Sequence, residues 1–301
     1  MAIQIIIALC EGPHDVAFLN KIIKTTGFIS NDKSKLEDYP RPISDILISE
    51  ATKADVEGLN IQEVRQSLLP AYTLVKEDVH ILLYVMGGDG KSEKRKDFAK
   101  KILSTIVQPG EIKQGRETHN VTFGIVYFFD SDDRGIENRV NAIKSELNQV
   151  IGLIPDNELV NNASFGLYGG IKLGFYIFSG DNNNTGKLED ILIPIMHENN
   201  AEIFEGATKF LNDFHDEERL FPLKLNLSQE QIAEERSKRA KDRYKYDRTK
   251  SLIGTVGQLQ QSGGANTVCI GFTDYLTLNK IQRNEKCQDI LQFLDEFINH
   301  K

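Results

Sequence analysis

Acidic residues follow two apolar segments of this chain, at positions where carboxylates could bind a cation. Glu11 follows the run 3–10, and Asp130 and Asp132 follow the run 121–129. Residues two apart in an extended chain point to the same side, so we expect Asp130 and Asp132 to face one way. Converging carboxylates repel one another, and Mg²⁺ or Mn²⁺ relieves that repulsion. The pattern predicts a metal centre suited to phosphoryl chemistry, although an Asp-x-Asp after a strand is also a common turn or helix cap.

Three units of strand, loop and helix position these acids. Apolar, β-branched runs at 3–10, 79–86 and 121–129 are typical of strands buried on both faces of a sheet, and residues at helical spacing follow each run. Consecutive units of this kind predict an α/β fold with a mostly parallel sheet flanked by helices. Ligands of such sheets bind beyond the carboxyl ends of the strands, where the acids lie.

The pattern changes along the chain and predicts two parts. Residues 1–195 form the α/β domain, with a polar, turn-rich insertion at about 28–78. Residues 196–301 form a mainly helical C-terminal extension, which we expect to pack on the first domain.

Composition excludes several classes of function. The 301 residues include 36 Lys and Arg against 44 Asp and Glu, a net charge of −8, so any polyanion must meet a local basic patch. Three cysteines without metal-ligand spacing indicate reduced thiols and a cytoplasmic location. No segment approaches the roughly 18 consecutive apolar residues of a membrane-spanning helix, so we expect no membrane contact.

Two segments carry local positive charge. Residues 91–101 include six basic and two acidic side chains, and residues 236–250 include eight basic and two acidic side chains. Such segments could bind the phosphates of nucleic acid, although a solvated helix face explains a run of charges equally well. The candidate nucleic-acid contacts are Arg239, Lys241, Lys245 and Lys250.

A glycine-rich loop, Gly87-Gly-Asp-Gly-Lys-Ser92, follows the second predicted strand. Backbone amides of such a loop can hold a phosphate, but a P-loop needs glycine at position 85, where this chain has valine. The spacing therefore argues against an NTPase. Lys91 is a candidate for the cation that stabilises a phosphoryl transition state, and a simple turn before a solvated helix is the alternative.

The acids share their order with a known family. Glu11-Gly12 with Asp15, followed two units later by Asp130-Ser131-Asp132, resembles the Toprim fold of topoisomerases, primases, recombination mediators and overcoming-lysogenization-defect nucleases. The segments Phe175-Tyr-Ile-Phe178 and Gly186-Lys-Leu-Glu189-Asp190 are similar to bacterial Toprim-like proteins of unassigned function, related to that nuclease branch. The resemblance covers roughly the predicted α/β domain.

The resemblance implies a role for each acid. Glu11 would be a metal ligand or general base, and Asp15 would be the second acid of the nuclease branch. Asp130 and Asp132 would be the metal-binding pair, and Glu189 would match a late acid that serves a second metal. Neither primase zinc fingers nor a strand-passage domain is recognisable in the sequence, which leaves nuclease-like or catalytically silent members of the family.

Two functions follow from this expectation. The chain would be a Mg²⁺-dependent Toprim-type phosphoesterase acting on nucleic acid, with Glu11 and Lys91 as catalytic residues. The alternative is a noncatalytic metal- or nucleotide-binding module in a defence or repair complex, with a protein partner such as an ATPase. The same carboxylates serve binding and catalysis, so both functions stay open. His14, near Glu11, could orient a carboxylate or bind metal, but a surface histidine is at least as common.

Overall fold

The chain forms two compact units, Met1–Ile191 with Leu278–Lys301 and Leu192–Thr277. The first unit contains the sheet and the predicted acids, and the second is helical. The computed structural model describes residues 3–32, 34–53, 69–106, 121–152, 154–180, 184–216, 228–231, 233 and 246–300.

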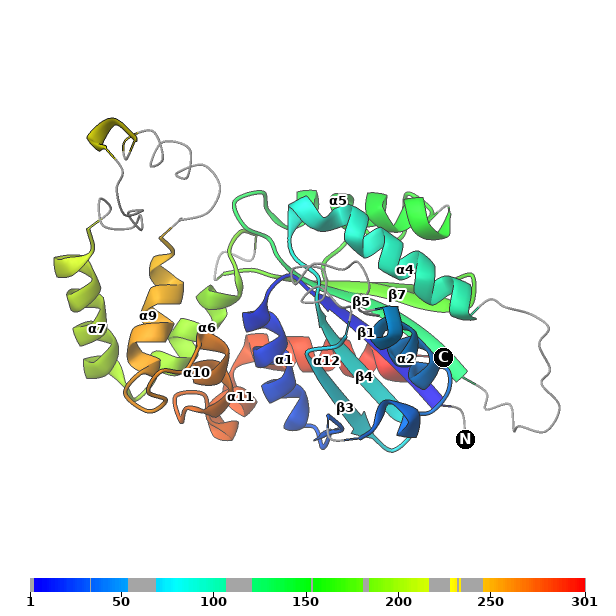
Figure 1. The fold of residues 1–301 in the computed structure, drawn as a ribbon, viewed down its shortest axis with the longest axis horizontal. Coiled ribbons are helices and arrows are strands. Elements are labelled where there is room, and N and C mark those ends of the chain that lie inside the picture. Colours follow the sequence, from blue (N-terminus) through cyan, green and yellow to red (C-terminus); the bar gives the residue numbers. More distant parts are fainter. Residues whose placement is uncertain are drawn as a thin grey trace. The chain divides into compact units, whose positions relative to one another are not determined.

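A seven-stranded sheet in the order β2-β3-β4-β1-β5-β7-β6 forms the centre of the first unit (Figure 1). Four neighbouring strands are parallel: β4 (Val79–Val85), β1 (Ile3–Cys10), β5 (Val121–Asp130) and β7 (Ile171–Phe178). β3 (Tyr72–Lys76) and β6 (Ser164–Tyr168) run antiparallel to their neighbours, and β2 (Ile29–Ser30) pairs antiparallel with β3. β2 therefore shares the direction of the central strands, and the predicted α/β fold with a mostly parallel sheet is confirmed.

The segment predicted as an insertion extends this sheet. It supplies β2, the 3₁₀ turn η1 (Leu36–Asp38), α2 (Ile43–Lys53) and β3. A tight turn at Glu77, where φ is 51°, connects β3 to β4. The segment therefore adds strands to one edge of the parallel core.

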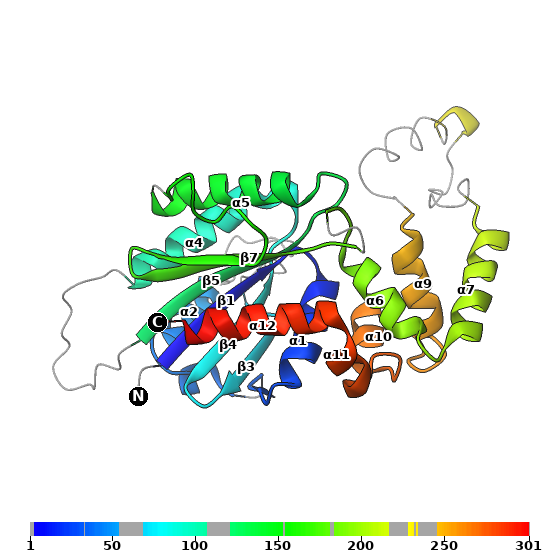
Figure 2. The ribbon, with the colours of Figure 1, turned by 180° about the vertical axis from the view of Figure 1, so that it is seen from behind.

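Helices cover both faces of the sheet, as two opposite views show (Figures 1 and 2). One face carries α1 (Pro13–Lys24) and α12 (Glu285–Asn299), which follows α11 (Leu278–Arg283). The other face carries α2, α4 (Ser92–Ile106) and α5 (Ile136–Ile151). Side chains alternate between the faces along each strand, and the core beneath α2, α4 and α5 includes Ile5, Ile7 and Leu9 of β1.

The last helix belongs to the first unit, whereas the sequence predicts that all residues after 195 belong to the C-terminal extension. Gly124 of β5 and Gly174 of β7 make room for the ring of Phe297. A Cβ atom at these glycines would lie 2.7 Å and 3.0 Å from carbon atoms of that ring. Residues 278–301, predicted as part of the extension, therefore complete the α/β unit because their helix fits two glycines of the sheet.

The second unit is helical in the residues described. α7 (Ala201–Phe214) and α10 (Asn266–Phe272) both pack against α9 (Arg248–Gly257), and α6 (Leu188–His197) crosses the division between the units. The helical character predicted for the C-terminal region is confirmed. Within the described ranges, no helix is long and apolar enough to cross a membrane.

Candidate functional site

The ends of parallel strands meet at one edge of the sheet. Gly87 N donates to Glu11 O over 3.0 Å, and Glu11 N donates to Phe128 O over 3.2 Å. The side chain of Glu11 reaches the end of β5, where Asp130 N donates to Glu11 Oε2 over 3.4 Å. The structure therefore places Glu11, Asp130 and the glycine-rich loop together, at the carboxyl edge where ligands of parallel sheets bind.

Asp130 lies near three further carboxylates, Asp15, Glu11 and Glu189, and we call these four residues the Asp130 cluster. Burial raises the pKa of Asp130 well above its usual value, and the negative charges of the other three add to that rise. Leu188 N, at the start of α6, donates to Asp130 Oδ1 over 2.8 Å and opposes the rise. The cluster contains four of the five acids predicted as metal ligands.

The first turns of two helices position the buried members of the cluster. Asp15, 3% exposed, accepts a hydrogen bond from Gly12 N over 2.7 Å and so caps the start of α1. His14 Nδ1 lies 2.8 Å from Glu189 Oε1, and the side chain of Glu189 is 2% exposed. His14 is therefore the partner of a buried carboxylate, and its bond fixes the orientation of Glu189. Orienting a carboxylate is one of the roles that the sequence suggested for His14.

Glu11 links the cluster to the glycine-rich loop. Gly88 packs so closely against Glu11 that a Cβ atom at position 88 would lie 2.3 Å from Glu11 Oε1. Burial raises the pKa of Glu11, and the charges of Asp132 and Asp89 raise it further. Arg139 and the N–H of Asp130 lower it. Glu11 is thus a more basic carboxylate than an exposed glutamate.

Asp132 does not face the same way as Asp130, contrary to the expectation for an extended chain. Its φ of 48° is left-handed, and its backbone forms a bridge in which Asp132 N donates to Gly186 O over 2.7 Å and Gly186 N donates to Asp132 O over 3.1 Å. The extended conformation therefore ends before residue 132. The side chain of Asp132 instead accepts a bond from Arg139 Nη2 over 2.7 Å.

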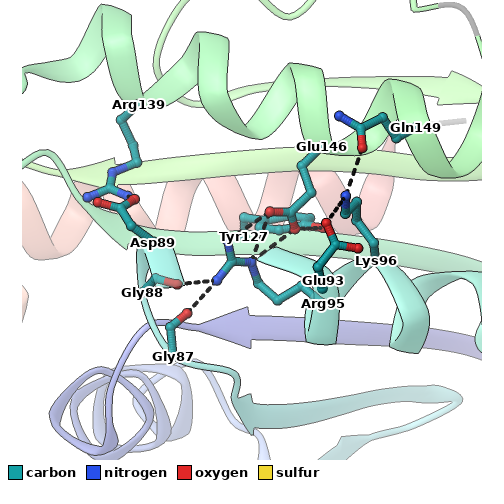
Figure 3. Close-up of polar contacts among 10 residues, drawn as sticks. All are labelled: Gly87, Gly88, Asp89, Glu93, Arg95, Lys96, Tyr127, Arg139, Glu146 and Gln149. Carbon is teal, nitrogen blue, oxygen red and sulfur yellow. Dashed lines mark hydrogen bonds and ion pairs between the residues drawn. The ribbon is translucent and has the colours of Figure 1, made fainter. Parts of the chain in front are cut away.

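Two arginines complete the surroundings of the site, and sequence reasoning missed both. Arg139 of α5, 4% exposed, donates Nη1 to Asp89 and Nη2 to Asp132. Arg95 of α4, 5% exposed, donates Nη1 to Gly87 O and to Gly88 O, each over 2.6 Å (Figure 3). Two helices therefore hold the glycine-rich loop.

The Arg95 side chain is itself paired. Arg95 Nη2 lies 2.7 Å from Glu146 Oε2, and Tyr127 donates its hydroxyl to Glu146 Oε1 over 3.1 Å. Arg139 and Glu146 share the buried face of α5 with Ile143, at spacings of four and seven residues. Charged residues at the apolar positions of an amphipathic helix are the signal that could have found these ion pairs.

Lys91 lies in the 3₁₀ turn η2 (Asp89–Lys91) and is exposed. Its stem covers Gly87, because a Cβ atom at that glycine would lie 2.7 Å from Lys91 Cγ. The structure thus places Lys91 on the loop that contacts Glu11. Lys250 lies on α9 in the second unit, whereas the other predicted nucleic-acid contacts, Arg239, Lys241 and Lys245, lie outside the described residues.

The donor chemistry of the Asp130 cluster suits a hard divalent cation. In the part of the chain that the structure describes, no three His, Cys, Asp or Glu side chains already form a group that could hold a metal ion. Mg²⁺ does not require such a group, since it is commonly bound through one or two carboxylates, several waters and the phosphate of a substrate. The raised pKa of Asp130 indicates that a nearby cation would stabilise its ionised form.

A polar cavity of about 470 Å³ opens near the carboxyl end of β7. Ser179, which follows β7, and Tyr176 line it from the sheet, and Lys286, Asp289 and Gln292 line it from α12. The ring of Phe293 forms an aromatic wall, 5.7 Å between centroids from that of Tyr176. This cavity offers aromatic and hydrogen-bonding groups on the α12 face of the first unit.

Comparison with known proteins gives a family but no activity. No curated protein matches the chain. A crystal structure of the hypothetical protein PH0156 from Pyrococcus horikoshii OT3 matches with 15% identity and a TM-score of 0.44, over 98% of this chain and 95% of that one. The model of one family matches residues 6–299. The chain therefore belongs to the family described as "Protein of unknown function (DUF3226)".

Proposed function

We propose that this chain is a Toprim-type phosphoesterase that depends on Mg²⁺ or Mn²⁺ and acts on nucleic acid. The observation that carries the proposal is the Asp130 cluster at the carboxyl edge of the sheet. Burial and three negative charges all disfavour the ionised form of Asp130. A carboxylate in this position is costly for the fold, and a divalent cation would recover that cost on binding.

The residues of the edge can divide the chemistry among them. A bound divalent cation would polarise a phosphodiester and lower the pKa of a water molecule. Asp130 and Asp15 would hold the cation, and Glu11, with its raised pKa, suits the acceptance of a proton from water. Lys91 presents an exposed side chain on the loop that packs against Glu11, where its ammonium group would offset the negative charge of the transition state.

Nucleic acid is the proposed substrate class because basic residues begin at the same loop. The segment 91–101 starts at Lys91 and continues along α4. Arg95 and Lys96 of this segment are buried, so its candidate phosphate contacts are Lys91, Lys94 and Lys100. Lys250 and the basic residues before it are separate candidate phosphate contacts. Cys10, Cys269 and Cys287 are free and buried, and we place the protein in a reducing cytoplasm.

A nuclease assay across divalent metals tests this proposal. Single- and double-stranded DNA and RNA are incubated with the wild type and with Asp130→Asn, in Mg²⁺, Mn²⁺ or chelator. We expect metal-dependent cleavage by the wild type only. Absence of cleavage on every substrate and with every metal would contradict the catalytic part of the proposal.

A second candidate is a noncatalytic module that acts through protein contacts, with a partner such as an ATPase. The observation that favours it is a pair of exposed aromatic side chains on α7, Phe210 and Phe214, which are 55% and 71% exposed. Their ring centroids lie 5.3 Å apart. Adjacent exposed aromatics are typical of protein-binding surfaces. Metal binding without cleavage, together with a partner that Phe210→Ser weakens, would favour this candidate.

A further inference from the structure

The acids at the carboxyl edge fall into two groups that lie on different faces of the sheet. Asp130, Asp15 and Glu189 belong to the side of α1 and the start of α6. Asp89 and Asp132 contact Arg139 of α5, on the opposite face, and we call these three residues the Arg139 group. Glu11 lies between the two groups and is affected by both.

Arg139 occupies the position of a cation between two carboxylates. Its Nη1 lies 2.5 Å from Asp89 Oδ1, and its Nη2 lies 2.7 Å from Asp132 Oδ2. The side chain is 4% exposed and lies over the ring of Phe129, with Cζ 5.9 Å from the ring centroid. Its Nε atom is also buried and has no hydrogen-bond partner. The guanidinium group is therefore held by the two acids and has little access to solvent.

A divalent cation bound between Asp89 and Asp132 would have to displace Arg139. Moving the guanidinium would break two charge-assisted bonds and leave a positive charge buried beside the incoming ion. The Asp130 cluster differs, because its other three carboxylates all disfavour the ionised form of Asp130, and no arginine is among the described groups that act on that residue. Competition between the two groups for a cation therefore favours the Asp130 cluster.

We infer that Arg139 takes the place of a second divalent cation, so that the site binds one exchangeable metal ion, at the Asp130 cluster. The inference rests on the proposed function for the metal ion at the Asp130 cluster. It concerns Asp132 and Asp89, which pair with Arg139 and do not bind a metal ion. Arg139 is a positioning residue in this view. It holds Asp132 and the loop at Asp89, whose negative charges both act on Glu11.

The number of bound Mn²⁺ ions tests the inference without any measurement of activity. Free and bound Mn²⁺ are counted by electron paramagnetic resonance in the wild type, Arg139→Gln and Arg134→Gln. Arg134 is the matched control because it pairs with the same Asp89, over 3.1 Å, but is 59% exposed. We expect one ion in the wild type and in Arg134→Gln, and a second ion in Arg139→Gln. Addition of Asp132→Asn to Arg139→Gln should remove the second ion.

A variant that keeps Arg139 covers the case in which Arg139→Gln does not fold. Asp132→Asn leaves Arg139 paired with Asp89, so Mn²⁺ affinity should change by less than about threefold. A direct metal ligand would lose on the order of tenfold or more. Two ions in the wild type, a folded Arg139→Gln that gains none, or a tenfold loss in Asp132→Asn would each overturn the inference. If the wild type binds no Mn²⁺, the proposed metal site is wrong. The number of Mn²⁺ ions that Arg139→Gln gains relative to the wild type still tests the role of Arg139.

Discussion

The buried ion pair between α4 and α5 provides a quantitative test of how the glycine-rich loop is held. Arg95 Nη2 lies 2.7 Å from Glu146 Oε2, and the side chains are 7% and 5% exposed. Glu146→Gln removes the negative charge and leaves the guanidinium buried without a counter-charge. Loss of one partner of a buried pair costs about 3–5 kcal/mol. We expect the lower end, about 3 kcal/mol, because Gly87 O and Gly88 O still accept from Arg95.

Glu93→Gln is the matched control for this change. Glu93 also pairs with a basic residue of α4, since Lys96 Nζ lies 2.6 Å from Glu93 Oε1, but its side chain is 82% exposed (Figure 3). Solvent screens such a pair, so its loss should change stability little. Hydrogen exchange of the β1 and β5 amides in urea reports the free energy of unfolding of the first unit.

The reasoning fails if Glu146→Gln destabilises the first unit no more than Glu93→Gln does. That result would mean that water or a neighbouring side chain replaces the lost charge at Arg95. A loss of about 3 kcal/mol with faster exchange at the Gly87 amide, which donates to Glu11 O, would instead support Arg95 as the residue that fixes the loop.

Three further predictions concern the site itself. Because the pKa of Asp130 is raised in the folded state, its contribution to stability is full at low pH and is lost as the pH rises above about 4 toward the folded-state pKa. Metal-free Asp130→Asn should therefore have a higher Tm than the wild type at pH 7 and should lose the Mg²⁺-dependent increase in Tm. Equal Tm values for the two metal-free proteins would contradict this. Gly88→Ala should displace the Glu11 carboxylate and weaken cleavage, whereas Gly90→Ala, whose Cβ would meet nothing within 4 Å, should not; kcat/KM of both variants checks this. Lys91→Met should bind Mg²⁺ normally in a thermal-shift titration but cleave on the order of 10²-fold more slowly, and full activity would remove Lys91 from the mechanism.

Hydrophobic periodicity was sufficient to predict the parallel core and the acids that end its strands. The runs that became β1, β4 and β5 are nearly continuous in apolar residues because both sheet faces are covered by helices. The convergence of Glu11 and Asp130 then follows from the common direction of parallel strands.

Features that depend on distant residues could not be predicted in this way. The return of α12 to the sheet depends on Phe297 fitting against Gly124 and Gly174, which no periodic pattern encodes. The partner of Asp132 also depends on a backbone bridge to Gly186, which comes after β6 and β7 in the sequence. A residue's position along a strand predicts its face only while the chain remains extended.

The left-handed backbone at Asp132 explains why two acids of one motif have different partners. By alternation, Asp130 shares the face of Phe128, which contacts Phe293 of α12. Asp132 would follow it to that face in an extended chain, but its φ of 48° turns the side chain to Arg139 on the face of α5. A non-glycine residue in this conformation is strained, and the two hydrogen bonds with Gly186 offset that strain. The strained residue therefore separates a carboxylate that is paired with an arginine from one that lies among other carboxylates, and the proposed metal site uses only the second.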